Sequence, residues 1–454
     1  MLAGVEAPRS DAAAGRRQVE RRIQREIEEE LGAGYDDELD LVHRSGLVLR
    51  VGRMSLASGT GSYRVKNHMA NVAAALGIER HHALVTLTEI TTTSHRGHSF
   101  RTEVTELREV GVNADRLVRL QDLVGSLAGR SIEPAELERR LDAIEARQPL
   151  YPWYLSGLFA GIACGAFAFL LGEGWGELIA AAVGAALGQM TRRLMHHARA
   201  NIIGTTMVAA LVASLSYLAL TWVLGATLGE AWGGSNGYIA AVLFLVPGFP
   251  LVTAALDLAR LDISAGVARL TYAVMIVSAA AVVVWGIAHT LGGAPDPAVT
   301  PDHDLWGRLA QLVASFAGVL GFALMFNSPW RVALTAAAVG AGPNVARILM
   351  VDSGTPPAVA AASAALVVGV VAAYVAPAIG SPRVIVSVPA VVIMVPGTTT
   401  YLAMSGLGDG ATSSAIAYGV QACVVMLGIA IGLAVARMLT DREWGFEARQ
   451  PRAR

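Results

Sequence analysis

The tripeptide Val-Pro-Gly occurs twice, at 246–248 and at 395–397, each time in the middle of a long apolar run. Proline has no N–H to donate, and its ring clashes with the carbonyl one turn back, so each tripeptide interrupts a helix. An interruption at membrane depth leaves backbone polar groups without partners, which is tolerated only inside protein or beside water. Two such breaks, 149 residues apart, predict a transporter whose central site is built from discontinuous helices.

Charge is distributed unevenly along the 454 residues. The first 150 residues hold 44 of the 71 Asp, Glu, Lys and Arg side chains, and the mean hydropathy of +0.50 is too high for one soluble enzyme. We therefore expect a polar extension with an amphipathic helix over 1–38, a cytoplasmic α/β domain over 39–150, membrane repeats over 151–292 and 305–440, and a cytoplasmic tail over 441–454. The polar N-terminus shows no signal peptide, and no basic stripe indicates nucleic acid.

Apolar windows of about 20 residues, the length that crosses the hydrocarbon core, predict ten membrane spans. Their expected ranges are 153–171, 177–191, 202–224, 238–258, 270–291, 308–326, 332–350, 357–378, 384–405 and 413–437. In this layout twelve arginines fall on the cytoplasmic side and two on the external side. Because positive residues concentrate in cytoplasmic loops, both termini are expected in the cytoplasm.

The ten spans divide into two sets of five. Phe167-Ala168 recurs as Phe322-Ala323 at an offset of 155, and the first Val-Pro-Gly recurs at an offset of 149. An odd number of spans per repeat reverses the second copy in the membrane. We therefore predict a polytopic α-helical membrane protein with two inverted five-helix repeats, each with a broken fourth helix. Chance similarity between Ala/Val-rich spans is the alternative.

The two breaks supply the predicted substrate site, which Pro247, Gly248, Pro396 and Gly397 would shape. Each restarted helix presents free N–H groups at its positive end, which suit a carboxylate. The carbonyls that end the upstream half suit an ammonium group or a cation. Together these ends suit a small zwitterion. The alternative is that the prolines are simple kinks, whose freed groups are met by neighbouring helices.

Polar side chains complete the predicted substrate site. Thr398 and Thr399 follow the second break, where threonine suits an N-cap and its hydroxyl could read a polar substrate. Thr253 follows the first break, and Asn327 lies at a membrane boundary after the sixth span, where a plain turn is the alternative.

Asp257 is the predicted proton-coupling residue, because an intramembrane carboxylate is often a proton relay or a ligand for a positive group. The alternative is that Asp257 lies at the cytoplasmic end of its span and pairs with Arg260.

The N-terminal part shows helical patterns over 40–57, 62–77, 113–129 and 133–147. Residues 81–94 and 99–107 alternate and are β-branched, so Arg96-Gly97 between them predicts a hairpin. The histidines near this hairpin, His81, His82, His95 and His98, have no metal-site spacing, and no nucleophile–base pairing can be named, so we expect no metal, no cofactor and no catalysis.

The run from Ser58 to Val65, the run from Leu256 to Leu258, and the run from Phe322 to Pro329 resemble the threonine/serine exporter family in its fused, two-half form. The resemblance covers roughly residues 40–440. It implies a bacterial inner-membrane secondary exporter of threonine and serine, driven by the proton gradient.

Two alternatives to that function stay open. Some members of the family occur as two chains associated with dicarboxylate export, so a succinate-like substrate is one alternative; the membrane core offers few arginines for it, chiefly Arg347. A membrane-tethered enzyme or sensor that acts through the soluble domain is the other. The Gly- and Ala-rich spans permit close packing within or between chains, so a homo-oligomer also stays open.

Overall fold

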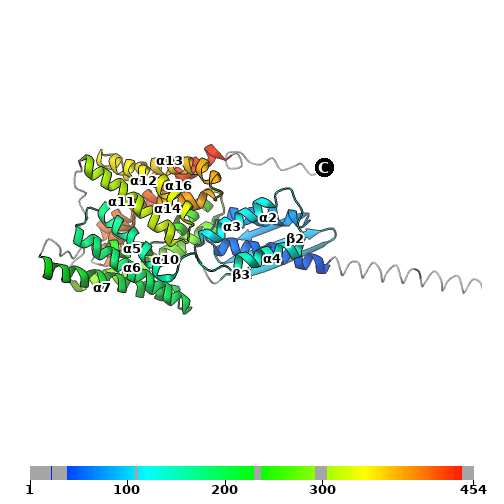
Figure 1. Cartoon of the computed structure of the whole chain (residues 1–454), viewed down its shortest axis with the longest axis horizontal. Coiled ribbons are helices and arrows are strands. Elements are labelled where there is room, and N and C mark those ends of the chain that lie inside the picture. Colours follow the sequence, from blue (N-terminus) through cyan, green and yellow to red (C-terminus); the bar gives the residue numbers. More distant parts are fainter. Residues whose placement is uncertain are drawn as a thin grey trace, which may run out of the picture.

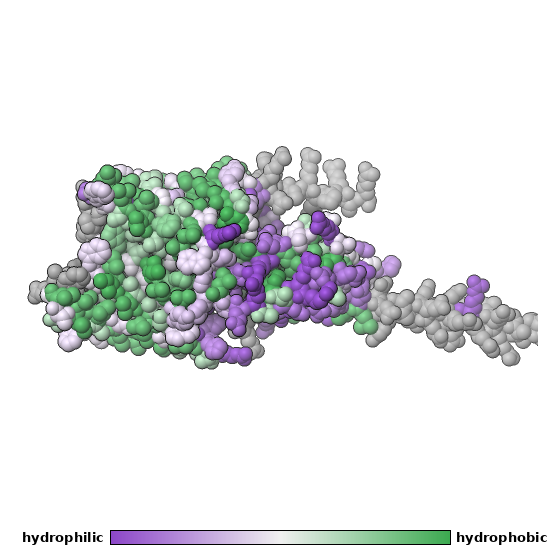
Figure 2. Space-filling model, viewed as in Figure 1, coloured by the Kyte–Doolittle hydropathy of each residue, from purple (hydrophilic) through white to green (hydrophobic). Residues whose placement is uncertain are grey.

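The computed structural model describes residues 22, 38–107, 111–229, 237–291, 304–408 and 410–441. The chain forms an N-terminal α/β domain and a helical bundle that lie side by side along the long axis of the molecule (Figure 1). Apolar side chains cover the surface of the bundle, whereas hydrophilic side chains dominate the surface of the N-terminal domain (Figure 2). The amphipathic helix expected over 18–31 lies outside the described residues, except for Arg22.

In the N-terminal domain, four helices share one hydrophobic core with a small sheet. The first helix spans 38–57, and it is followed by α2 (Ser62–Ala75), α3 (Ala114–Ser126) and α4 (Pro134–Glu145). Apolar residues at helical spacing form the core, because each helix buries only one side. The fully buried members of this core include Val48, Val51, Val65, Met69, Val72, Leu120, Leu137 and Leu141.

The sheet has three antiparallel strands in the order β1 (Arg80–Val85), β2 (Glu89–Arg96) and β3 (Ser99–Glu106). The prediction of a single strand over 81–94 is wrong, because the chain turns at 86–88 and pairs Val85 with Ile90. A hydrogen bond from the backbone N–H of Thr86 to the carbonyl of Glu89 closes this turn at 2.9 Å. The expected turn at Arg96-Gly97 is present, and it joins β2 to β3.

Helices fill the rest of the described chain. They are α5 (Trp153–Leu170), α6 (Trp175–His197), α7 (Ile202–Leu228), α8 (Tyr238–Val242), the 3₁₀ turn η2 (Leu243–Leu245), α9 (Gly248–Ala259), α10 (Ile263–Leu291), α11 (Leu305–Met325), α12 (Trp330–Asp352), α13 (Pro357–Ala378), α14 (Arg383–Val392), α15 (Gly397–Gly408) and α16 (Thr412–Thr440). Within the described residues, seven helices are long and apolar enough to cross a membrane, or nine spans if each of two bent pairs counts as one.

The helix α6 is long enough to cross a membrane but not apolar enough to meet this criterion, although a span was expected over 177–191. It carries Glu177 in its first turn, and Arg192 and Arg193 lie near its end. It packs against both α5 and α7, so only part of its surface is left for lipid. The tenth span therefore stays a prediction.

Small residues bring the helices of the bundle close together. A Cβ added at Gly161 of α5 would lie 2.6 Å from the carbonyl oxygen of Ala182 in α6, and one added at Gly184 of α6 would lie 2.5 Å from that of Ala213 in α7. Because glycine has no Cβ, the backbones of neighbouring helices can approach closely and pack well. This packing matters in lipid, where no hydrophobic effect drives helices together.

Candidate functional site

The first Val-Pro-Gly breaks a helix as the sequence predicts. The segment Tyr238–Leu245 and the helix α9 meet at an angle of 54°. Pro247 has φ −79° and ψ 62°, the geometry of an inverse γ-turn, and the N–H of Gly248 donates to the carbonyl of Val246 at 2.8 Å. The helix restarts at once, with the N–H of Leu251 bonded to the carbonyl of Pro247 at 3.0 Å.

The second Val-Pro-Gly repeats this geometry. The helices α14 and α15 meet at 56°. The N–H of Gly397 donates to the carbonyl of Val395 at 2.8 Å, and the N–H of Thr400 donates to the carbonyl of Pro396 at 3.0 Å. Both hydrogen bonds join residues that lie 149 positions after the corresponding residues of the first break. The same local sequence has therefore produced the same turn twice.

The two breaks contact one another in a reciprocal way. A Cβ added at Gly248 would lie 2.9 Å from a methyl group of Val392, just upstream of the second break. A Cβ added at Gly397 would lie 2.5 Å from a methyl group of Leu243, just upstream of the first. Gly397 corresponds to Gly248, and Val392 corresponds to Leu243, at the offset of 149 residues. Each break therefore places its glycine against the equivalent residue of the other break.

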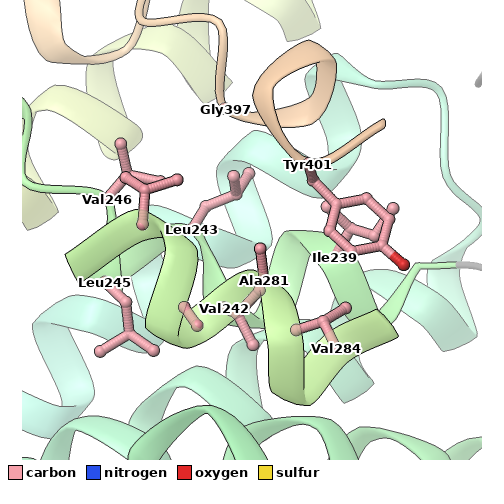
Figure 3. Close-up of a pocket in the computed structure, with 11 residues that line it drawn as sticks. Ile239, Val242, Leu243, Leu245, Val246, Ala281, Val284, Gly397 and Tyr401 are labelled. Atoms are coloured by element: carbon pink, nitrogen blue, oxygen red, sulfur yellow. The ribbon is translucent and has the colours of Figure 1, made fainter. Parts of the chain in front are cut away.

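A cavity of about 30 Å³ lies between the first break, α10 and the start of α15 (Figure 3). Gly397 and Tyr401 border it from α15, and Leu243 and Val246 from the first break. Among the described residues that line it, Tyr401 alone has a side-chain hydroxyl. The volume is far below the roughly 300 Å³ of a small-molecule pocket, so this conformation leaves no room for an amino acid there.

The threonines after the second break are engaged with the backbone. Thr399 and Thr400 donate their hydroxyl protons to the carbonyl of Pro396, at 3.0 and 2.7 Å. The expectation that Thr398 or Thr399 caps the restarted helix is therefore wrong, because the helix already begins at Gly397 and places both residues inside its first turn. Thr398 lies in the same turn and is partly buried.

A buried ion pair joins α9 to α10. Asp257 Oδ2 lies 3.1 Å from Arg269 Nε, and the two side chains are only 3% and 2% exposed. Arg269 Nη1 also donates to the hydroxyl of Thr253 at 3.4 Å. The structure therefore brings two of the predicted site residues, Thr253 and Asp257, to one arginine that was not among the predicted site residues.

The N-terminal domain closes this ion pair with a turn of its own. The backbone N–H of Ser62 donates to Asp257 Oδ1 at 3.0 Å, and Arg269 Nη2 donates to the carbonyl of Thr60 at 2.8 Å. Asp257 thus caps the N-terminus of α2 from 195 residues away, where Gly61 has no side chain to do so. A carboxylate at this position also meets the positive end of the helix dipole.

A second layer of charge surrounds the pair. Asp262 accepts a hydrogen bond from the hydroxyl of Ser62 at 2.7 Å and forms a salt bridge with Lys66. The guanidinium of Arg260 lies over the ring of Tyr63, 3.6 Å from its centroid. The alternative interpretation paired Asp257 with Arg260, whereas the ion pair formed is with Arg269, because α10 turns back alongside α9.

Asn327 lies at the junction of the two parts of the chain rather than with the breaks. Its side chain accepts from the N–H of Leu150 and donates to Asn113, both at 2.8 Å, and its carbonyl accepts from the N–H of Asp115 at 3.1 Å. Its φ of 62° is left-handed, which asparagine tolerates better than most residues. All the polar groups named here hold the start of α3 and the linker.

A serine–histidine contact lies inside the N-terminal domain. Ser55 Oγ is 3.0 Å from His68 Nδ1, and His68 Nε2 is 3.2 Å from Gln121 Oε1, which also accepts from Arg64. Since that oxygen can only accept, Nε2 carries the proton and Ser55 donates to Nδ1. Burial, reinforced by Arg64, lowers the pKa of His68 to about 4. Ser55 is fully buried, so the contact braces three helices and offers no accessible nucleophile.

The arrangement defines a class of protein, a polytopic helical membrane protein. It has two broken helices that contact each other, and a buried ion pair near the end of the first. Comparison with known families is more specific. Residues 46–291 match the family described as "Putative threonine/serine exporter", and residues 311–439 match "Threonine/Serine exporter, ThrE". The chain belongs to the threonine/serine exporter (ThrE) family.

Individual relatives fall into two groups. The threonine/serine exporter of Corynebacterium glutamicum is 26% identical over 87% of this chain and 82% of its own length. The "Probable succinate transporter subunit YjjP" of Escherichia coli K12 is 25% identical over 53% of this chain and 94% of its own length. The YjjP protein of Klebsiella aerogenes is also 25% identical, over 51% and 90%. No solved structure matches the chain.

Proposed function

We propose that this protein exports small hydroxy amino acids, threonine and serine, across the cytoplasmic membrane in exchange for protons. The observation that carries the proposal is the buried Asp257–Arg269 pair at the end of a broken helix, beside Thr253. A carboxylate and a guanidinium together match the ammonium and carboxylate groups of one amino acid. The relative that spans both halves of the chain is a threonine/serine exporter, which supports the same substrate class.

Proton exchange follows from competition at one carboxylate. Asp257 can hold a substrate ammonium group or a proton, but not both, so departure of the substrate from Asp257 frees the carboxylate for a proton. A single buried carboxylate that alternates between these partners is a common basis of proton coupling. The sign of the exchange is export of substrate against import of a proton.

The membrane arrangement that we propose has ten spans in two inverted repeats, with both termini in the cytoplasm. The reciprocal contacts of Gly248 with Val392 and of Gly397 with Leu243 support a two-fold relation between the halves. A second cavity, of about 10 Å³, supports this relation as well. Three pairs of equivalent residues from the two halves line it, namely Phe167 with Phe322, Leu243 with Val392, and Val246 with Val395. The two halves would rock about this axis to alternate access.

A dicarboxylate such as succinate is the second candidate, and the YjjP relatives favour it. Asp257 opposes it, because a buried carboxylate repels a substrate that carries two negative charges. The tethered-enzyme alternative has the contact of Ser55 with His68 in its favour, but both side chains are buried.

The test is efflux of labelled threonine from vesicles that contain the purified full-length protein, with and without a proton gradient. We expect efflux that accelerates when the acceptor side is acidic, and unlabelled succinate should compete poorly. The variant Asp257→Asn should lose the effect of the gradient, because an amide cannot take up a proton. Leakage equal to that of protein-free vesicles would end the exporter proposal, and preferential competition by succinate would transfer it to dicarboxylates.

A further inference from the structure

We propose that Asp257 and Arg269 form the cytoplasmic entry site for a zwitterionic amino acid, and that the turn Thr60–Ser62 occupies this site as an internal substitute for the substrate. The inference rests on the exporter function proposed above. It adds to that function the two side chains that bind the substrate and the segment that blocks them.

The turn presents the same groups as an amino acid. The N–H of Ser62 donates to Asp257 at 3.0 Å, where a substrate ammonium would donate, and the carbonyl of Thr60 accepts from Arg269 at 2.8 Å, where a substrate carboxylate would accept. Both groups of the turn are neutral. Those of the substrate are charged, and charge-assisted hydrogen bonds are roughly twice as strong as neutral ones. A free amino acid can therefore compete with a turn that is already in place.

The pair keeps unused hydrogen-bonding capacity. Asp257 Oδ2 and Arg269 Nε lie 3.1 Å apart but are not aligned for a hydrogen bond, and among the described residues neither atom has another hydrogen-bond partner. The hydroxyl of Thr60, also buried, has none either within the described part of the chain. A buried ion pair is costly unless its remaining donors and acceptors are filled, so the site favours a ligand that fills them.

Thr253 gives the site a means to read a hydroxyl group. Its own proton is donated to the carbonyls of Phe249 and Pro250, at 3.0 and 3.2 Å, so its oxygen acts as an acceptor. Arg269 already approaches that oxygen at 3.4 Å. A substrate hydroxyl next to the carboxylate-binding arginine would find an acceptor there, which fits serine and threonine better than their apolar analogues.

Gly61 allows the turn to enter the site. Its φ of −67° and ψ of 157° are open to any residue, so the backbone conformation does not require glycine. A Cβ at this position, however, would lie 2.8 Å from Asp257 Oδ1. The glycine therefore serves the close approach to the carboxylate, and a side chain there would push the turn out of the site.

The first experiment weakens the turn and leaves the ion pair intact. Ser62→Pro removes the donating N–H at the first residue of α2, a position that proline suits, after an extended residue that can precede proline. Ser62→Ala is the matched control that keeps the N–H. Gly61→Ala displaces the turn by its Cβ, and Gly125→Ala in α3 is its control, because nothing lies within 4 Å of that Cβ.

In vesicles, Ser62→Pro and Gly61→Ala should lower the KM for threonine at the cytoplasmic face by about threefold to tenfold relative to their controls. The reason is that the apparent dissociation constant equals the intrinsic one divided by the fraction of molecules whose site is open, and both variants raise that fraction. Unchanged KM values in both variants, with wild-type vesicles that export threonine, would overturn the blocking role and leave the exporter function standing. Wild-type vesicles that export nothing would instead defeat the exporter function.

The second experiment tests the ligand assignment by binding to the solubilised full-length protein. Threoninamide keeps the ammonium group of threonine and lacks its carboxylate. Arg269→Gln should weaken threonine binding by about tenfold or more, the value of one lost charged hydrogen bond, and should leave threoninamide binding unchanged. Equal losses for both compounds, in Arg269→Gln and in the milder Arg269→Lys, would show a structural role and overturn the assignment.

Discussion

At the scale of single residues, buried polar groups in this chain are held by partners that lie far away in the sequence. His68 is one example, since its two ring nitrogens contact Ser55 and Gln121 on different helices. Burial and the nearby charge of Arg64 disfavour the protonated ring, so the residue stabilises the domain only while it is uncharged.

This requirement predicts a pH dependence of stability. Burial lowers the pKa of His68 to about 4, from 6.5 in the unfolded chain. The unfolded state therefore binds a proton first as pH falls, and the stability contributed by His68 is full above about pH 6.5 and declines toward pH 4, by about 3 kcal/mol. The measurement is the thermal unfolding midpoint of the full-length protein between pH 7.5 and 4.5.

The variant His68→Gln is the control for this prediction, because it removes the titrating group and keeps a side chain that can hydrogen-bond. Its midpoint should fall less between these two pH values than that of the wild type, although other groups, including His81, will still titrate. Parallel curves for the two proteins would contradict the prediction.

At the scale of elements, the two broken helices behave as one unit. Each break places its glycine against a residue a few positions upstream of the other break, Gly248 against Val392 and Gly397 against Leu243. The hydrogen bonds around the two prolines are also equivalent. Steric demands of proline set the position of each break, whereas contact between the breaks depends on how the two halves pack.

The reciprocal contact predicts two coupled pairs of mutations. Gly397→Ala should cost about 1–3 kcal/mol by overpacking against Leu243, and Leu243→Ala should remove much of that penalty. Gly248→Ala and Val392→Ala should couple in the same way. Double-mutant cycles on thermal unfolding measure both coupling energies.

Gly342→Ala provides the control for these cycles, because its Cβ would meet nothing within 4 Å. It should neither destabilise the protein by overpacking nor couple to Leu243→Ala. Coupling in one pair but not the other would argue against a two-fold relation between the halves.

At the scale of the whole molecule, the N-terminal domain touches both halves of the bundle. The turn Thr60–Ser62 lies on α9 and α10, and the start of α3 lies on the loop between α11 and α12, through Asn327. If the halves rock against each other, at least one of these contacts must change. The domain is thus placed to sense or limit the motion, on the side that we assign to the cytoplasm.

That assignment predicts which residues are open to the outside of the cell. In a chain with Cys164 and Cys423 replaced by alanine, Ser126→Cys in α3 should resist a membrane-impermeant maleimide until the cells are opened. Thr227→Cys, exposed near the end of α7, should react in intact cells. The reverse labelling pattern would invert the proposed topology, and labelling of both from outside would place the two residues on the same side.

Local steric rules decided the part of this protein that could be predicted from sequence. Both Val-Pro-Gly tripeptides break a helix, as the missing N–H and the ring clash predict, whereas Pro343, Pro377 and Pro389 lie inside helices. Apolar runs and helical periodicity likewise located most helices. The helix α6 falls below the hydropathy of a membrane span, because its charged and small residues lower the mean hydropathy.

Tertiary structure alone decided which groups meet. Asp257 was a candidate because a carboxylate in an apolar run is costly, but its neighbours in sequence suggested Arg260, and its partners are Arg269 and the N–H of Ser62. Ser62 is 195 residues away, and no local rule reaches that far. A buried charge is stable only with the partners that the packed fold delivers, so its role follows from the fold and not from its place in the sequence.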